Sequence, residues 1–265
     1  MAVLVGVFGS MVGSFLNVVV SRVPLKRSII SPPSACMGCG TRIKWSENIP
    51  VLSWLFLRGK CRSCKSAISM RYPIVELGTG VFFGVATWRF LPPSDNALFL
   101  LIAFLYLAAV SVALALIDLE TQTLPNSILL PSYLIGALLL GAAAITGGDY
   151  GAMLRAGISA VALWLLYLAL AFAYPGGMGF GDVKLAGLLG LFLGYLGWDV
   201  LVTGAFAAFV LGGIFSLALL ISRRANRKSG IPFGPWMLAG AWIGVLFGES
   251  IVQGYLSFFG LAENL

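Results

Sequence analysis

About eight stretches of this chain are apolar enough and long enough to cross a membrane as helices. A helix needs about 20 apolar residues to cross a hydrocarbon layer roughly 30 Å thick. The stretches lie at 2–20, 74–91, 98–117, 128–146, 154–174, 183–197, 200–222 and 233–258. The composition, 59% hydrophobic and 10% charged, excludes a single soluble domain. We therefore expect an all-α polytopic membrane protein of about eight helices.

Positive charge gathers on one side of these expected helices. Ten of the 17 Lys and Arg residues lie between Arg22 and Arg71, and five more, Lys184 and four between 223 and 228, lie at breaks on the same side. Only Arg89 and Arg155 fall on the other side. Since basic residues of short loops stay in the cytoplasm, we expect both termini outside it. The cytoplasmic loops would be 22–73, 118–127, 175–182 and 223–232. Topology and anionic membrane lipids then explain the net charge of +7, and no nucleic-acid partner is expected.

All four cysteines lie in the loop at 22–73, as the pairs Cys36/Cys39 and Cys61/Cys64. Two CxxC pairs at this separation are typical of a tetrahedral four-cysteine zinc site. The reducing cytosol disfavours disulfides, and a closed four-thiolate site has no open position for substrate. We therefore predict a structural zinc that folds a small zinc-knuckle loop. The alternative is a membrane thiol oxidoreductase, but no further cysteine exists to continue a dithiol relay.

The chain contains no histidine. This excludes Ser-His and Cys-His nucleophile pairs and zinc peptidases with histidine ligands. Acid and base chemistry must then come from carboxylates, Lys, Tyr or thiols.

Two aspartates, Asp118 and Asp182, stand at the expected cytoplasmic ends of membrane helices. A carboxylate at membrane depth is costly and is therefore a functional candidate. Because both lie at the same depth on the same side, they can converge and share one proton, as the two carboxylates of aspartic proteases do. Either residue alone could be a helix cap, but the pair predicts the active site of an aspartic peptidase.

The segment around Asp182 reads Gly179-Phe-Gly181-Asp182-Val-Lys184. Its glycines permit irregular backbone and close approach of a substrate, so we assign Gly179, Gly181 and Lys184 to an active-site loop. Lys184 could influence the ionisation of Asp182 or extend its amine to the membrane interface.

Several motifs in this order resemble the bacterial type IV prepilin peptidases, the leader peptidase/N-methyltransferases of the GxGD aspartic class. They are Gly13–Val20 with Arg22-Val-Pro24, the two CxxC pairs, Arg71-Tyr-Pro73, Glu76-Leu-Gly78, Ile117-Asp118, Leu124-Pro125-Asn126 and Gly179–Leu185. The likeness covers nearly the whole chain. Met37 stands where many relatives have proline, and Asn126 stands where an acidic residue is common.

The resemblance implies an enzyme of the bacterial inner membrane with two activities. The first is cleavage of the basic leader of prepilins or pseudopilins after a glycine, with Asp118 and Asp182 as the catalytic pair. The second is methylation of the new N-terminal amine with S-adenosylmethionine, for which Glu76 is a candidate binding residue. The resemblance also implies an N-terminal region at 1–95, associated with methyl transfer, and a peptidase region at 96–265.

Two alternatives remain open at this stage. A monofunctional peptidase would cleave the leader without methyl transfer. A non-enzymatic, ion-coupled transporter would use Asp118 and Asp182 as ion sites at broken helices. It predicts repeats of inverted topology, and none is convincing in the sequence.

Overall fold

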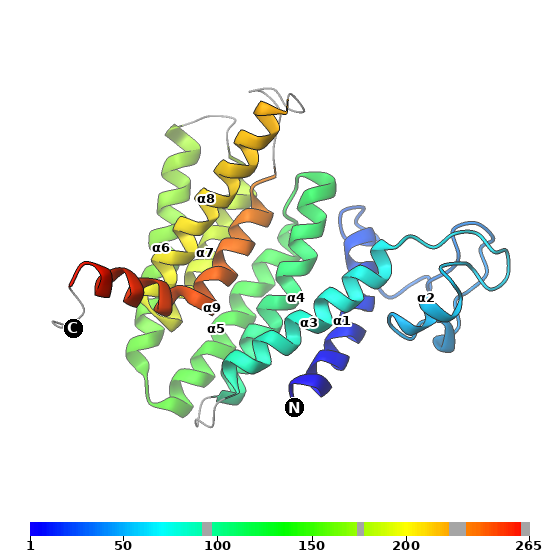
Figure 1. The fold of residues 1–265 in the computed structure, drawn as a ribbon, viewed down its shortest axis with the longest axis horizontal. Helices are drawn as coiled ribbons and strands as arrows, with labels where there is room; N and C mark the ends of the chain where they lie inside the picture. The colour runs from blue at the N-terminus through cyan, green and yellow to red at the C-terminus, as the bar shows by residue number, and fades with distance from the viewer. Residues whose placement is uncertain (92–96, 174–177, 223–231, 261–265) are drawn as a thin grey trace. The chain divides into compact units, whose positions relative to one another are not determined.

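A computed structural model describes residues 1–91, 97–173, 178–222 and 232–260 (Figure 1). The helices are α1 (Ala2–Arg22), the 3-10 turn η1 (Trp45–Glu47), α2 (Leu52–Phe56), α3 (Arg71–Phe90), α4 (Ala97–Thr121), α5 (Asn126–Gly147), α6 (Tyr150–Ala173), α7 (Phe180–Leu196), α8 (Trp198–Ile221) and α9 (Gly234–Phe258). Among the described residues the only β-structure is two isolated bridges. The prediction of an all-α membrane protein is confirmed.

Each of the predicted apolar stretches corresponds to one long helix. Within the described ranges, six helices are long and apolar enough to cross a membrane: α1, α4, α5, α6, α8 and α9. The other two long helices differ for visible reasons. Helix α3 contains three charged residues, Arg71, Glu76 and Arg89, and α7 has only 17 residues.

The chain divides into two compact units, Met1–Ile117 and Asp118–Leu265. In the first unit, α1 and α3 pack with their backbones in close approach. A Cβ atom on Gly80 would lie 2.8 Å from the carbonyl oxygen of Gly6, and one on Gly13 would lie 2.8 Å from the Cα of Glu76. Small residues are what allow two membrane helices to approach so closely.

In the second unit, α7 is enclosed by its neighbours, because it packs against α5, α6, α8 and α9. Every residue of α7 from Val183 to Tyr195, except Lys184, is buried. At its C-terminal end, the guanidinium of Arg155 on α6 donates hydrogen bonds to the carbonyls of Gly194 and Tyr195, at 2.7 and 2.8 Å. Protein therefore surrounds α7 on all sides, which explains why a helix of only 17 residues suffices here.

Some predictions fall outside the described residues. These are residues 175–177 of the loop at 175–182, residues 223–231 of the loop at 223–232, with Arg223, Arg224, Arg227 and Lys228, and the boundary between 95 and 96.

Candidate active site and metal centre

Asp118 lies near the C-terminal end of α4 and its side chain is buried, with 3% exposed. Its Oδ2 accepts a hydrogen bond from the backbone N–H of Gly234, at 3.1 Å. Gly234 is the first residue of α9, where the N–H groups have no partner within the helix. The partial positive charge at a helix N-terminus also favours a carboxylate. The N-terminus of α9 is thus the binding site of the Asp118 carboxylate.

Asp182 lies in the first turn of α7 and is 9% exposed. Its Oδ2 accepts a hydrogen bond from the backbone N–H of Gly179 at 3.1 Å, and its own N–H donates to the carbonyl of Gly179 at 3.1 Å. These reciprocal bonds fix the glycine loop to the helix that follows it. The carboxylate of Asp182, like that of Asp118, therefore contacts the N-terminus of a helix, which stabilises negative charge.

The side chain of Leu124 packs against two glycines, Gly181 and Gly234, that lie next to the two aspartates. A Cβ atom on Gly181 would lie 3.0 Å from the Cβ of Leu124, and one on Gly234 would lie 3.4 Å from its Cδ2. The α4–α5 connection, the glycine loop and the start of α9 therefore meet at one place. Asp118 binds the N–H of Gly234, and Asp182 directly follows Gly181, so each aspartate adjoins a glycine that packs against Leu124. The structure thus brings the two predicted residues together.

An aromatic cluster supports the start of α9. The ring centroid of Phe209 lies 5.4 Å from that of Tyr167 and 5.6 Å from that of Phe233, and the rings of Tyr167 and Phe233 are 6.3 Å apart. Phe233 directly precedes Gly234. These ring contacts therefore help to position the Gly234 N–H, which donates the hydrogen bond to Asp118.

Gly234 is not among the residues predicted from the sequence. The sequence does indicate a helix N-terminus at this position. Gly234-Pro235 lies at the beginning of the last apolar stretch, and proline is favoured in the first turn of a helix. The same break lies on the side of the membrane where Asp118 and Asp182 are expected.

The remaining residues of the predicted loop have separate roles in the structure. Gly181 packs against Leu124, and Gly179 binds Asp182. The amine of Lys184 donates a hydrogen bond to Oδ1 of Asn126, the first residue of α5, at 2.9 Å. Lys184 therefore links α7 to α5, and its bond is to an amide rather than to the Asp182 carboxylate.

Glu76, the candidate for the methyl donor, is 8% exposed and makes a contact within the protein. Its Oε2 accepts a hydrogen bond from the backbone N–H of Val51, at 2.7 Å. Val51 has φ 61° and ψ −50°, and Leu52 N–H donates to the Pro50 carbonyl at 2.6 Å. This is a γ-turn of the strained kind, which is rare for a β-branched residue. The Glu76 carboxylate thus holds a strained turn of the long loop.

The four cysteines form a cluster whose Sγ atoms all lie within 4.8 Å of one another. A tetrahedral zinc with Zn–S distances of about 2.3 Å places its sulfurs about 3.8 Å apart. The Sγ atoms of Cys36 and Cys64 are 3.7 Å apart. The donor set and its spacing therefore fit a closed, structural zinc site.

The two CxxC turns share one backbone pattern. The N–H of Cys36 donates to the carbonyl of Thr41 at 3.0 Å, and the N–H of Cys61 donates to the carbonyl of Ser66 at 2.8 Å. The residue after the second cysteine has a positive φ in both turns: Gly40 at 69° and Lys65 at 61°. Each turn is thus a knuckle that presents two sulfurs to a common point.

The hydroxyl of Ser66 lies between sulfurs of both knuckles, 3.4 Å from Cys36 Sγ and 3.1 Å from Cys64 Sγ. Hydrogen bonds from Ser66, which contributes most, and from the backbone of Cys39 and Gly38 lower the pKa of the Cys36 thiol to about 6. The hydrogen bond of Ser66 is also the largest cause of the lowered pKa of Cys64. Since the thiolate is the form that binds metal, Ser66 favours zinc binding at neutral pH.

Replacing Cys39 with serine is expected to remove zinc from the purified protein, because three thiolates leave the tetrahedral shell open. Elemental analysis of the membrane-extracted chain should show about one zinc ion per chain in the wild type and almost none in the variant. Ser63→Ala is the matched control, since Ser63 is an exposed residue between Cys61 and Cys64. Unchanged zinc content in Cys39→Ser would contradict the four-thiolate site.

Comparison with protein families identifies two matching models. Residues 7–90 match the bacterial peptidase A24 N-terminal domain, and residues 105–217 match the type IV leader peptidase family. These ranges separate the part of the chain with the cysteine cluster from the part with both aspartates.

Among curated proteins, the chain is similar to several that bear the name prepilin leader peptidase/N-methyltransferase. The protein of Aeromonas hydrophila is 38% identical, over 97% of this chain and 94% of that protein. The protein of Pseudomonas aeruginosa is 34% identical, over 95% and 92% respectively. The protein of Bacillus subtilis is also 34% identical, over 94% of this chain and 96% of that protein. No solved structure matches the chain.

Proposed function

This chain belongs to the type IV leader peptidase family, and we propose on that basis that it is an aspartic endopeptidase of the bacterial inner membrane. Its substrates would be type IV prepilins and pseudopilins, cut after a glycine at the cytoplasmic face. It would then methylate the new N-terminal residue with S-adenosylmethionine. The observation that carries the peptidase proposal is the meeting of two buried carboxylates, Asp118 and Asp182, each at a helix N-terminus.

In the proposed cleavage, one carboxylate is ionised and the other protonated. The ionised group takes a proton from a water molecule, while the protonated group donates a hydrogen bond to the oxygen of the scissile carbonyl. The water oxygen bonds to the carbonyl carbon, and the C–N bond then breaks as the leaving amine receives a proton. The products are a leader that ends in a carboxyl group and a mature chain with a new N-terminal amine.

The backbone donors keep the two carboxylates in place for this chemistry. Oδ2 of Asp118 is held by Gly234 and Oδ2 of Asp182 by Gly179. In each aspartate, Oδ1 would be the oxygen that acts on water or substrate. Burial away from bulk water strengthens the attraction between these groups and the charge that develops in the transition state.

The two regions of the chain would divide the work. We assign the peptidase to residues 96–265, which contain Asp118, Asp182 and the loop residues Gly179, Gly181 and Lys184. The region at 1–95 would hold a structural zinc on Cys36, Cys39, Cys61 and Cys64 and serve methyl transfer. S-adenosylmethionine would supply a methyl group to the free amine, which loses one proton. The basic loop at 22–73 would lie in the cytoplasm, with both termini outside.

The experiment that tests this proposal is intact mass spectrometry of a prepilin-like substrate incubated with the lipid-reconstituted protein. Loss of the leader is expected in every incubation, and S-adenosylmethionine should add the mass of one methyl group to the product. Loss of the leader without the methyl increment would leave a monofunctional peptidase. No cleavage of several such substrates by protein with full zinc content would contradict the peptidase and favour the ion-coupled transporter.

A further inference from the structure

The long loop of the first unit carries an apolar segment, Trp45–Leu57, in which several large side chains are exposed. Trp45 is 85% exposed and Phe56 84% exposed, and Leu52 and Leu55 are also exposed. The segment contains the short turn η1 and helix α2. A cluster of exposed apolar side chains on one short segment indicates a surface that meets an apolar partner.

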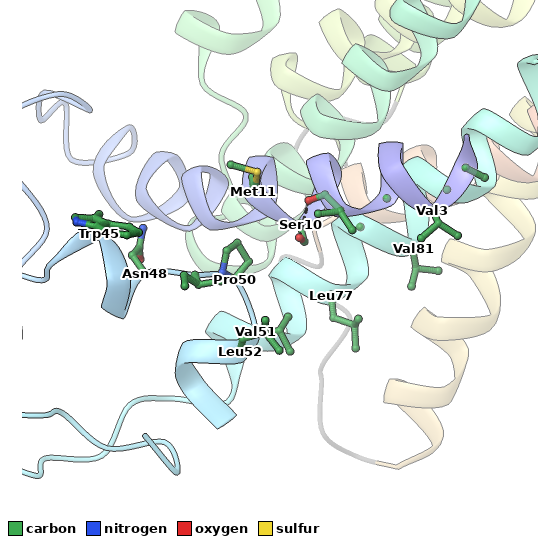
Figure 2. Close-up of a pocket in the computed structure, with 16 residues that line it drawn as sticks. Val3, Ser10, Met11, Trp45, Asn48, Pro50, Val51, Leu52, Leu77 and Val81 are labelled. Carbon is green, nitrogen blue, oxygen red and sulfur yellow. Dashed lines mark hydrogen bonds between the residues drawn. The ribbon is translucent and has the colours of Figure 1, made fainter. Parts of the chain in front are cut away.

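This segment lies against the membrane helices of its own unit. Together with α1 and α3 it encloses a groove of about 830 Å³ (Figure 2). The groove is lined almost entirely by apolar side chains, among them Val7, Met11, Val51, Leu52, Leu77 and Val81. Helix α1 is itself apolar enough to cross a membrane. The groove is therefore continuous with a surface that faces acyl chains.

One hydrogen bond joins the segment to α3, and a second joins it to the rest of the loop. Glu76 on α3 holds the N–H of Val51 at 2.7 Å, and the indole N–H of Trp54 donates to the carbonyl of Ile68 at 3.1 Å. Glu76 is the sixth residue of α3, which begins at Arg71. At 1.5 Å per residue the contact lies about 7.5 Å along the helix from its basic end. This is the depth at which interfacial segments bury their apolar side chains.

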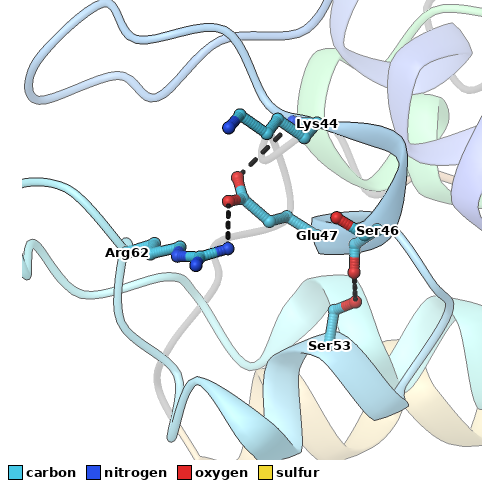
Figure 3. A network of polar contacts seen from close by, with 5 residues as sticks. All are labelled: Lys44, Ser46, Glu47, Ser53 and Arg62. Atoms are coloured by element: carbon cyan, nitrogen blue, oxygen red, sulfur yellow. Dashed lines mark hydrogen bonds and ion pairs between the residues drawn. The ribbon is translucent and has the colours of Figure 1, made fainter.

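The charge around the segment is strongly positive. Ten Lys and Arg residues lie between Arg22 and Arg71, against one acidic residue, Glu47. Glu47 is already paired, because its carboxylate accepts hydrogen bonds from Arg62 at 3.3 Å and from the N–H of Lys44 at 3.4 Å (Figure 3). The net positive charge of this loop complements the anionic headgroups of a cytoplasmic leaflet.

We propose that Trp45–Leu57 is an interfacial segment that docks on the anionic lipid surface of the membrane. Its exposed aromatic and aliphatic side chains lie at the boundary of the acyl chains, and acyl chains fill the groove between the segment, α1 and α3. The surrounding basic residues contact the lipid phosphates. Docking holds the four-cysteine cluster at the membrane surface, and it does not depend on either proposed enzymatic activity.

Photocrosslinking of the full chain tests this proposal. A photoreactive phenylalanine, p-benzoylphenylalanine, replaces Phe56 in one variant and the exposed Ser63 of the second knuckle in a control variant. Both are reconstituted in nanodiscs of phosphatidylcholine with phosphatidylglycerol, and retained zinc content shows that each has folded. We expect a lipid adduct in the intact mass at position 56 with a yield at least several-fold above that at position 63. Equal yields, or an adduct of position 56 with a second copy of the chain, would overturn the lipid assignment.

Hydrogen exchange of the unmodified chain tests the charge argument separately. In nanodiscs with phosphatidylglycerol, amides of Trp45–Leu57 should exchange several-fold more slowly than in nanodiscs of phosphatidylcholine alone. The amides of α7, which protein encloses, should not differ between the two lipids. The same exchange in both lipids at Trp45–Leu57 would show that anionic headgroups do not hold the segment.

Discussion

Substitution of Asp118 or of Asp182 by asparagine is expected to abolish leader cleavage. Asparagine keeps the shape of the side chain and can still accept a backbone N–H, but it can neither take a proton from water nor share one with its partner. General acid–base groups contribute about 10²–10⁴-fold to a rate, so either variant should lose at least that much activity. A time course of substrate mass in lipid nanodiscs measures the loss.

Asp199→Asn provides the control for this experiment. Asp199, like Asp182, lies in the first turn of its helix, α8, but at the end of the second unit near the C-terminus of α7. Cleavage should be unchanged in this variant. The zinc content of all three variants should also be unchanged, because the cysteines lie in the other unit. Cleavage at the normal rate by Asp118→Asn or Asp182→Asn would exclude the aspartic mechanism.

A pre-cleaved substrate separates the two activities. The aspartate variants should still methylate a mature chain that already has a free N-terminal amine, if methyl transfer belongs to the region at 1–95. Loss of methylation along with cleavage would instead tie both activities to the aspartate pair.

The positions of the helices could be predicted because lipid allows few backbone structures. A backbone in hydrocarbon must bond to itself, so each apolar stretch had to become a helix. The boundaries depended on contacts that the apolar pattern does not contain. Helix α7 begins at Phe180 rather than at residue 183, because the Asp182 carboxylate binds Gly179 and closes the first turn.

The four-cysteine cluster could also be predicted, since the spacing of a CxxC pair is a local property of the chain. The structure brings Cys36 and Cys64 together as that pattern requires. The role of the loop around them could not be predicted. Helix α2 has only five residues, and its place beside the membrane helices depends on the bond between Glu76 and Val51, which are 25 residues apart.

The meeting of Asp118 and Asp182 was predicted from one expectation, that both lie at equal depth on one side of the membrane. That argument gives no information on the direction in which each carboxylate points. Gly234 was missed for this reason: its contact with Asp118 joins residues 116 positions apart, and it is made by a backbone N–H rather than by a side chain.

Replacing Gly234 with alanine is therefore the most informative single change near the site. The new Cβ atom would lie 2.7 Å from Oδ2 of Asp118, closer than such atoms approach one another, so the carboxylate must turn away. Reacting groups misplaced by about 1 Å can lose about 10²-fold in rate, and we expect a loss of cleavage of that size. The rate of leader removal in nanodiscs measures it.

This loss is expected without unfolding, which distinguishes a positioning effect from a structural one. Gly234 is not among the described glycines with positive φ, so alanine can adopt its backbone conformation. Gly254→Ala is the matched control, because Gly254 lies in the same helix and a Cβ there would meet no atom within 4 Å. This variant should keep full activity. Equal cleavage rates in Gly234→Ala and Gly254→Ala would show that the N–H of Gly234 does not position Asp118 for the reaction. The orientation of the Asp118 carboxylate would then have no effect on the rate.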